Sequence, residues 1–217
     1  MNGKILVMTA VKAEKDAVSR GLRGNERFDV MLAGVGPAAA AANTAIALRE
    51  DGPYALVVSA GIAGGFEGVA EIGDVVVSTA IVAGDLGAET PEGFRGVDEL
   101  GFGSTRVEVD AAWTHQAAEA IAAGGLTVRA GPIVTVSTAT GTAATAARHA
   151  ARIPGVAAEG MEGYGVAAAG AALGVPALEI RAISNRVGPR DRSAWRIGDA
   201  LASLEAAFAT LQEAWQR

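Results

Sequence analysis

Two short segments carry residues that could do chemistry within an otherwise apolar part of the chain. Residues 159–163 read EGMEG, and residues 181–185 read RAISN. A partly buried carboxylate is costly unless it is paired or hydrogen-bonded, so we expect Glu162 to have a polar partner, for which a sugar diol is suitable. The alternative is that Glu162 only begins a helix, where a negative charge favours the helix dipole.

The elements that must position these residues follow from the hydrophobic pattern. Apolar segments of strand length are found at residues 5–9, 28–33, 55–59, 74–82, 127–137, 156–159 and 176–184. Segments with helical character are found at residues 13–21, 38–50, 110–123, 142–152, 163–173 and 196–215. Continuous apolar strands that alternate with helices are typical of a largely parallel sheet covered on both faces. We predict one α/β domain over residues 1–217, with a twisted, mixed but mostly parallel central sheet between layers of helices.

One long segment, residues 84–105, has no clear periodicity and is rich in glycine and charge. Loops of this length in a compact domain are usually functional or contribute to an interface.

Composition excludes several classes of protein. Half of the residues are hydrophobic and 19% are charged, with a formal net charge of −6, which disfavours a nucleic-acid partner or an anionic membrane surface. There is no cysteine, and the two histidines, His115 and His149, have no companions at metal-ligand spacing. No apolar run is long enough to span a membrane, and the N-terminal residues do not have the pattern of a signal peptide. We therefore expect a cytoplasmic protein without a metal or other cofactor.

Ligands of such sheets collect beyond the carboxyl ends of the strands, and further candidate residues lie there. Glu14 falls in the first turn of the first helix, residues 59–66 form a glycine-rich turn, and residues 136–142 form a small polar turn. Taken one at a time, Glu14 could be an acid that only favours the helix dipole, and the two glycine-rich and polar segments could be ordinary tight turns. Because all three fall at the same edge of one sheet, together they predict a ligand site.

The turn SAGIAGG at 59–65, the GMEG segment and the RAISN segment match, in order and spacing, the nucleoside phosphorylase and nucleosidase superfamily. The chain resembles the purine nucleosidases within it, and the run SNRVGPRD at 184–191 with Trp195 and Ile197 resembles the futalosine hydrolase family. The resemblance implies a three-layer α/β/α fold of the nucleoside phosphorylase type, a homo-oligomer, and a nucleoside and water as substrates.

Roles for individual residues follow from the resemblance. Glu14 resembles the carboxylate that activates water, and Glu162 resembles the residue that binds the ribose hydroxyls. Met161 would pack its thioether on the sugar, although it could equally be a core residue. The residues expected to line the base and sugar pockets are Gly61, Ile62, Ala63, Gly141, Thr142 and Gly160.

Asn185 stands where nucleosidases acting on adenine nucleosides have an aspartic acid. An amide can donate to O6 of hypoxanthine and accept from N7–H, whereas a carboxylate would oppose O6 with a second acceptor. Asn185 therefore favours a 6-oxopurine, unless it serves only as a turn residue.

Four guanidinium groups, of Arg186, Arg190, Arg192 and Arg196, lie within eleven positions of an acidic chain. Futalosine carries a benzoate at the far end of its sugar substituent, and arginine matches a carboxylate bidentately. The sequence does not decide which of the four makes this contact; Arg190 is the candidate carried forward, and Arg95, reaching from a neighbouring subunit, is a further one. The alternative is a solvated loop paired with nearby acids.

Three other functions remain open from the sequence. One is a methylthioadenosine/adenosylhomocysteine-type nucleosidase on the same fold. Residues 34–37 precede a helix and could hold phosphate, which would make the protein a phosphorylase, although Glu14 would repel it and only Lys12 lies near as a cation. A non-catalytic dinucleotide-binding domain is a more distant alternative, because Pro37 interrupts the usual glycine fingerprint.

Overall fold

The computed structural model describes residues 3–215, and every helix and strand predicted from the sequence has a counterpart in it. The helices are α1 (Lys12–Leu22), α2 (Pro37–Glu50), α3 (Ala111–Ala123), α4 (Ala143–Arg152), α5 (Gly163–Ala172) and α6 (Ile197–Ala214), with a 3-10 turn, η1 (Arg192–Ala194). The strands are β1 (Lys4–Thr9), β2 (Phe28–Leu32), β3 (Tyr54–Gly65), β4 (Val75–Ala83), β5 (Gly87–Thr90), β6 (Gly93–Gly96), β7 (Arg106–Glu108), β8 (Val128–Thr135), β9 (Ala158–Gly160) and β10 (Ala177–Arg186).

The main sheet is mixed and mostly parallel, as the sequence predicted, but it curls into a partly barrel-like form and is not a simple layer between the helices. β3 is long enough to have two different neighbours along one edge: β1 pairs with it as far as Ser59, and β9 pairs with Gly64 and Gly65 beyond. The other edge of β3 pairs with β10, which pairs with β4, and β8 joins β4 to β9. These pairings close a barrel-like ring, from which β1 and β2 extend as an open wing.

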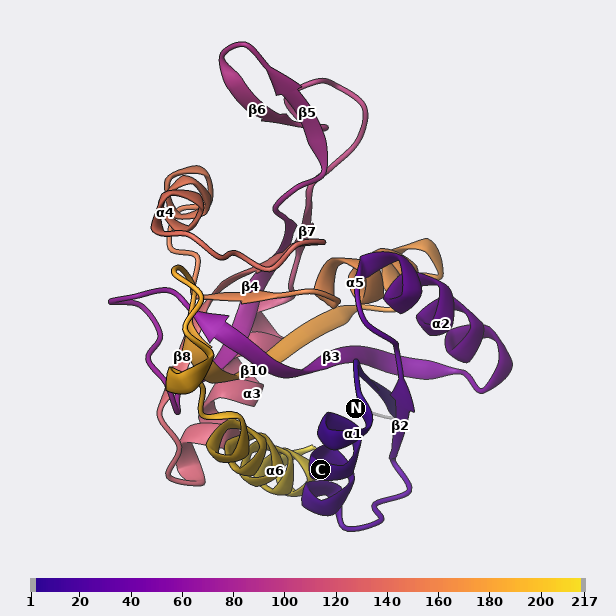
Figure 1. Cartoon of the computed structure of the whole chain (residues 1–217). Helices are drawn as coiled ribbons and strands as arrows, with labels where there is room; N and C mark the ends of the chain where they lie inside the picture. Colours follow the sequence, from indigo (N-terminus) through magenta and orange to yellow (C-terminus); the bar gives the residue numbers. More distant parts are fainter. Residues whose placement is uncertain (1–2, 216–217) are drawn as a thin grey trace.

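Helices cover this sheet from two sides (Figure 1). Helices α1, α3 and α6 pack together on one side, and α2 and α5 pack together on the other. The main core consists of aliphatic residues of β1, β3 and β10 against these helices, with Phe208 of α6 and Trp215 at its C-cap. Among residues 3–215, no helix is both long and apolar enough to cross a membrane.

Two segments differ from the sequence-based prediction. Residues 59–65, expected as a turn, continue strand β3, because they pair with β10 along this whole segment. The glycines at 61, 64 and 65 leave room for neighbouring groups close to the strand. Residues 84–105 contain the hairpin β5–β6, which projects from the body at the top of Figure 1. Its strands are only half-buried, so the hydrophobic pattern there is too weak to be recognised.

Candidate active site

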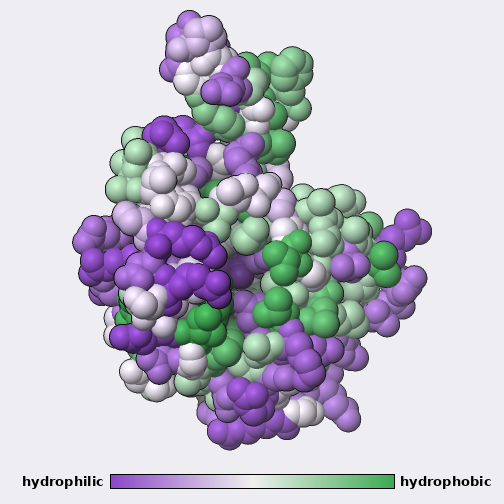
Figure 2. Space-filling view, viewed as in Figure 1, coloured by the Kyte–Doolittle hydropathy of each residue, from purple (hydrophilic) through white to green (hydrophobic). Residues whose placement is uncertain are grey.

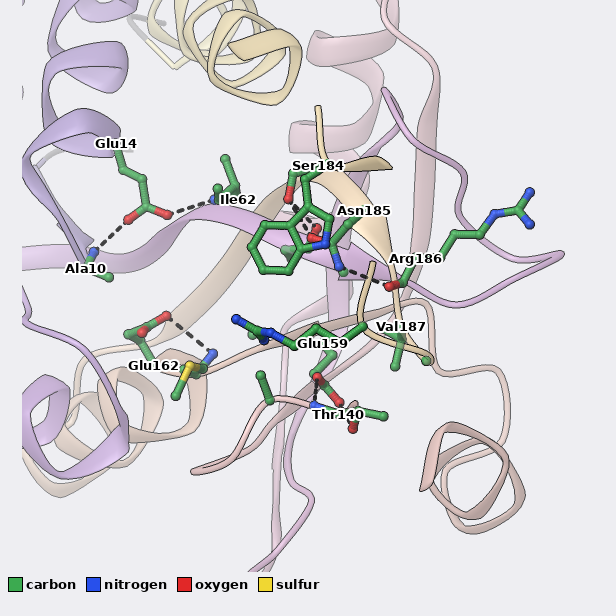
Figure 3. A pocket seen from close by; sticks show the side chains of 18 of the residues that line it. Ala10, Glu14, Ile62, Thr140, Glu159, Glu162, Ser184, Asn185, Arg186 and Val187 are labelled. Atoms are coloured by element: carbon green, nitrogen blue, oxygen red, sulfur yellow. Dashed lines mark hydrogen bonds between the residues drawn. The ribbon is translucent and has the colours of Figure 1, made fainter. Parts of the chain in front are cut away.

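A pocket with a volume of about 200 Å³ opens where β3, β9 and β10 meet the start of α1. Figure 2 shows a hollow at the centre of this face, with hydrophilic residues to its left and hydrophobic patches to its right. The polar and charged side chains that line the pocket include those of Glu14, Thr140, Glu159, Glu162, Asn185 and Arg190. In the close view, Glu14 and Glu162 lie on one side of the pocket, and Asn185 and Glu159 lie on the other (Figure 3).

The side chain of Glu14 is buried at the start of α1. Its Oε2 accepts hydrogen bonds from the backbone N–H groups of Ala10 (3.0 Å) and Val11 (3.2 Å), and its Oε1 accepts one from Ile62 (2.9 Å). Burial raises the pKa of Glu14 above its ordinary value; the charge of Glu162 raises it further, while that of Arg181 opposes the shift. A carboxyl group whose pKa is moved toward neutrality is suited to take a proton from water.

Glu14 is part of a buried charge cluster that also contains Glu162, Glu179 and Arg181. The guanidinium of Arg181 is only 1% exposed; it bonds Glu179 through Nε (2.8 Å) and Glu162 through Nη2 (3.1 Å). Nη2 also donates to the hydroxyl of Ser59 at 3.1 Å. Burial disfavours the charged form of Arg181, but the three carboxylates outweigh it, so that its pKa lies above the ordinary value. Arg181 therefore holds Glu162 in place as a fixed cation, and its charge also acts on Glu14.

Glycine residues make room for this cluster. A Cβ atom on Gly61 would lie 2.4 Å from Oε1 of Glu14 and 2.8 Å from Nη1 of Arg181. A Cβ atom on Gly163, the last residue of the EGMEG segment, would lie 2.0 Å from Oε2 of Glu179. The segment 159–163 thus packs against the strand that carries the segment 181–185: Gly163 admits the carboxyl of Glu179, two residues before Arg181, and a Cβ atom on Gly160 would lie 3.1 Å from Cζ of Arg181.

We expect Gly163→Ala to destabilise the protein by at least about 2 kcal/mol, because forcing a methyl group into a filled site typically costs 1–3 kcal/mol and Glu179 has no space to retreat. The measurement is the free energy of unfolding in urea. Gly198→Ala is the matched control, since no atom lies within 4 Å of a Cβ at that helical position. Equal stabilities of the two variants would contradict the packing argument.

Glu162 connects the cluster to the pocket. Its Oε1 accepts from the backbone N–H of Gly36 at 3.3 Å, and its Oε2 accepts from that of Met161 at 3.3 Å as well as from Arg181. Gly36 is the N-cap of α2, so the carboxylate of Glu162 occupies the positive end of this helix. The polar partner predicted for Glu162 is therefore present in the protein itself.

Asn185 lies within β10, paired with Gly64 of β3. Its Oδ1 accepts from the hydroxyl of Ser184 at 2.8 Å, and its Nδ2 donates to the carbonyl of Arg186 at 3.0 Å. These two bonds fix the orientation of the amide. One N–H and one lone pair remain for a ligand, which is the combination that O6 and N7–H of hypoxanthine require.

Glu159 lines the pocket on the same side as Asn185 (Figure 3). Both of its oxygens bond Thr140: Oε1 accepts from the backbone N–H at 2.8 Å, and Oε2 accepts from the hydroxyl at 2.5 Å. Burial raises the pKa of Glu159, while the two bonds from Thr140 oppose that shift.

The arginines of the last loop have different surroundings. Arg186 bonds Glu67 (3.0 Å) and Glu71 (3.2 Å) at the surface. The guanidinium of Arg190 lies 5.1 Å from the centre of the Trp195 ring, and both residues line the pocket. Arg190 is thus placed beside the pocket as a cation, whereas Arg95 of the hairpin pairs with Glu99, which follows the hairpin.

The remaining predicted residues divide into two groups. Ile62, Ala63, Gly160 and Met161 line the pocket, and Gly61 lies behind it against Glu14 and Arg181. Gly141 and Thr142 do not line it: Gly141 lines the neighbouring hollow, and Thr142 caps α4 by accepting from Thr145 N–H. Their places in the pocket wall are taken by Ala139 and Thr140, because the chain turns away from the pocket to begin α4.

The sequence-based prediction assigned no role to Arg181, Glu179 or Thr140. A signal for the first two was present, because they are opposite charges two positions apart in an apolar strand and so point to the same buried face. No group of three or more possible metal-ligating side chains is found within residues 3–215.

Comparison with known proteins identifies the family. The family model of the phosphorylase superfamily matches residues 10–214. The chain is 51% identical to futalosine hydrolase of Streptomyces coelicolor, covering 98% of this chain and 97% of that one. It is 47% identical to futalosine hydrolase of Acidothermus cellulolyticus, covering 99% and 93%. The chain belongs to the futalosine hydrolase family of the phosphorylase superfamily.

Solved structures show the same fold at low sequence identity. Futalosine hydrolase of Helicobacter pylori superimposes with a TM-score of 0.81 at 17% identity, covering 99% of this chain and 97% of that one. The methylthioadenosine/adenosylhomocysteine nucleosidase of Neisseria meningitidis gives a TM-score of 0.82 at 20% identity, covering 98% and 100%. The futalosine hydrolase family thus shares its fold with these nucleosidases, and the pocket residues must decide between substrates.

Proposed function

We propose that this protein hydrolyses the N-glycosidic bond of futalosine, releasing hypoxanthine and dehypoxanthine futalosine, a step of menaquinone biosynthesis. The observation that carries the proposal is the arrangement of one pocket, in which the carboxylates of Glu14 and Glu162 face the oriented amide of Asn185. Membership of the futalosine hydrolase family supports the same substrate.

Hydrolysis of an N-glycosidic bond passes through a sugar with oxocarbenium character. Glu14, with its raised pKa, is the general base that takes a proton from the attacking water. Glu162 accepts hydrogen bonds from the 2′- and 3′-hydroxyls of the ribose, and its charge favours the positive ring of the transition state. Met161, adjacent to it in the pocket wall, packs against the sugar.

The leaving base is held by Asn185. Its remaining N–H donates to O6, and its Oδ1 accepts from N7–H once the departing base has taken up a proton from water at N7. Arg190, beside the pocket with Trp195, is the partner for the benzoate at the far end of the substrate. We further propose that the protein acts as a cytoplasmic homo-oligomer, as its family resemblance implies.

Phosphorolysis on the same fold is disfavoured by two contacts. The N–H of Gly36, at the start of α2 where phosphate would bind, already donates to Glu162. Lys12, the cation expected nearby, is 81% exposed and pairs with Asp16 at 2.6 Å. Activity should therefore be independent of phosphate, and product analysis with and without phosphate distinguishes the two reactions.

The substrate is tested by Asn185→Asp. We expect the ratio of kcat/KM for futalosine over its 6-amino analogue to fall at least about tenfold, equivalent to roughly 1.4 kcal/mol of transition-state binding. The carboxylate would oppose O6 with an acceptor, whereas on the amino analogue it accepts from the amine and, when protonated, donates to N7. A ratio that does not move would make Asn185 a structural residue and leave the choice of base to other groups.

A further inference from the structure

Glu159, Gly64 and Asn185 form a row across three neighbouring strands. Gly64 of β3 is paired with Glu159 of β9 on one edge and with Asn185 of β10 on the other. The register between β3 and β10 shifts just before Asn185, and Glu159 and Asn185 both line the pocket. They therefore flank a position at which the intervening residue, Gly64, has no side chain.

The absence of a side chain at Gly64 keeps this gap open. A Cβ atom there would lie 2.9 Å from Cγ2 of Val187 and 3.3 Å from Nδ2 of Asn185, so it would press on the amide that holds the base. The result is a slot with an amide at one end, a carboxylate at the other and a backbone floor between them. A flat ring system with polar edges fits this slot.

Glu159 is fixed within the slot but is not saturated. Thr140 supplies one hydrogen bond to each carboxylate oxygen, and each oxygen can accept another. Within residues 3–215, the structure records neither an ion pair nor a further hydrogen-bond donor to this carboxylate. A nearly buried carboxylate with spare acceptor capacity is a site for an N–H donor of the ligand.

We propose that Glu159 is a specificity-determining residue that accepts the N1–H of a 6-oxopurine. The inference rests on the proposed function, because it requires that Asn185 holds the O6/N7 edge of the base. N1–H is adjacent to O6 on the side away from N7, so it faces the end of the slot opposite Asn185. The base is then held from both sides, and Glu159 extends recognition to an edge that Asn185 does not reach.

A 6-aminopurine has a lone pair at N1 in place of the N–H. The carboxylate of Glu159 would face that lone pair with a lone pair of its own. A ligand that leaves polar groups in a buried site without hydrogen bonds is strongly rejected. Asn185 and Glu159 thus select against the amino analogue by separate contacts on separate strands.

The test is Glu159→Gln, which keeps the shape of the side chain. The amide oxygen still accepts a hydrogen bond from the N–H of Thr140. The amide NH₂ takes the place of Oε2, so that a hydrogen-bond acceptor becomes a donor. We expect the kcat/KM ratio of futalosine over its 6-amino analogue to fall at least about tenfold, since the new donor matches N1 of the aminopurine. Glu119→Gln is the control; this glutamate is exposed on α3, where it pairs with His115, and its loss should leave the ratio unchanged.

Wild-type protein provides a second measurement that does not depend on the variant's folding. Binding of hypoxanthine and 1-methylhypoxanthine is compared by calorimetry, and the methylated base, which lacks N1–H, should bind at least about tenfold more weakly. Equal binding of the two bases, or an unmoved ratio in Glu159→Gln, would overturn the role of Glu159 while wild-type protein still releases hypoxanthine from futalosine. Failure of wild-type protein to cleave any 6-oxopurine nucleoside would instead overturn the proposed function itself.

Discussion

Glu14→Gln should lower kcat for futalosine by at least about 10²-fold, the usual effect of losing a positioned general base. The amide cannot accept a proton from water, while its oxygen can still accept from the N–H groups of Ala10 and Val11. The contact with Ile62 N–H is lost, so the melting temperature is measured beside kcat to establish that the variant is folded. Substrate affinity should change far less than turnover.

The dependence of kcat/KM on pH tests the same role of Glu14 as the general base. Because burial raises the pKa of Glu14 above its ordinary value near 4.5, the wild-type kcat/KM should fall on acidification at a pH above that value, as the base becomes protonated. The acidic limb should be absent from the residual activity of Glu14→Gln. Asp16→Asn, on the same helix at the surface, is the control and should keep both the rate and the profile. Near wild-type turnover of Glu14→Gln would remove this residue from the mechanism.

Arg181→Met should destabilise the folded protein by about 3–5 kcal/mol at neutral pH, the usual cost of leaving buried charges without their partner. Glu179 is completely buried, and its Oε2 already has no hydrogen-bond partner among the described residues. Removing the guanidinium leaves Glu179 and Glu162 as neighbouring carboxylates without a cation. The measurement is the free energy of unfolding in urea over a range of pH.

The direction of the pH dependence follows from linkage. Burial raises the pKa of Glu179 above the value it has in the unfolded chain, and loss of Arg181, which opposes that shift, raises it further. A group with a raised pKa favours the folded state in its protonated form, so the deficit of Arg181→Met should shrink as the pH falls through the folded-state pKa. Arg186→Met is the matched control: its two ion pairs are at the surface, and its loss should cost less than about 1 kcal/mol at any pH. A deficit independent of pH would mean that packing, not charge, accounts for the loss.

The sequence was informative where burial imposes a pattern. Apolar strands and alanine-rich helices predicted the order of elements, and Glu14, Glu162 and Asn185 were predicted at strand ends that the structure brings to one pocket. The residue types were sufficient for this prediction, because a carboxylate or an amide in apolar surroundings requires a hydrogen-bond partner.

Closure of the sheet could not be predicted in the same way. It depends on β9, which is only three residues long, and on glycines at 61, 64 and 65 that were interpreted as a turn. Glycine lowers strand propensity, and the compensating reason, space for Glu14 and Arg181, lies in contacts far apart in the sequence. The same limitation placed Gly141 and Thr142 in the pocket in place of Ala139 and Thr140, since a shift of two residues is invisible in a run of small polar side chains.

The pairing of β9 with β3 and β8 also affects when the pocket forms during folding. Gly64 must find Glu159 across nearly a hundred residues of chain, and Asn185 lies further still. Contacts at such separation form late, because loop closure is opposed by chain entropy until the local elements are in place. The wing of β1 and β2 can assemble from nearby residues, whereas the pocket has neither a floor nor opposing ends until the ring closes. Binding competence should therefore be the last property that the newly made chain acquires, and the slowest to return after denaturation.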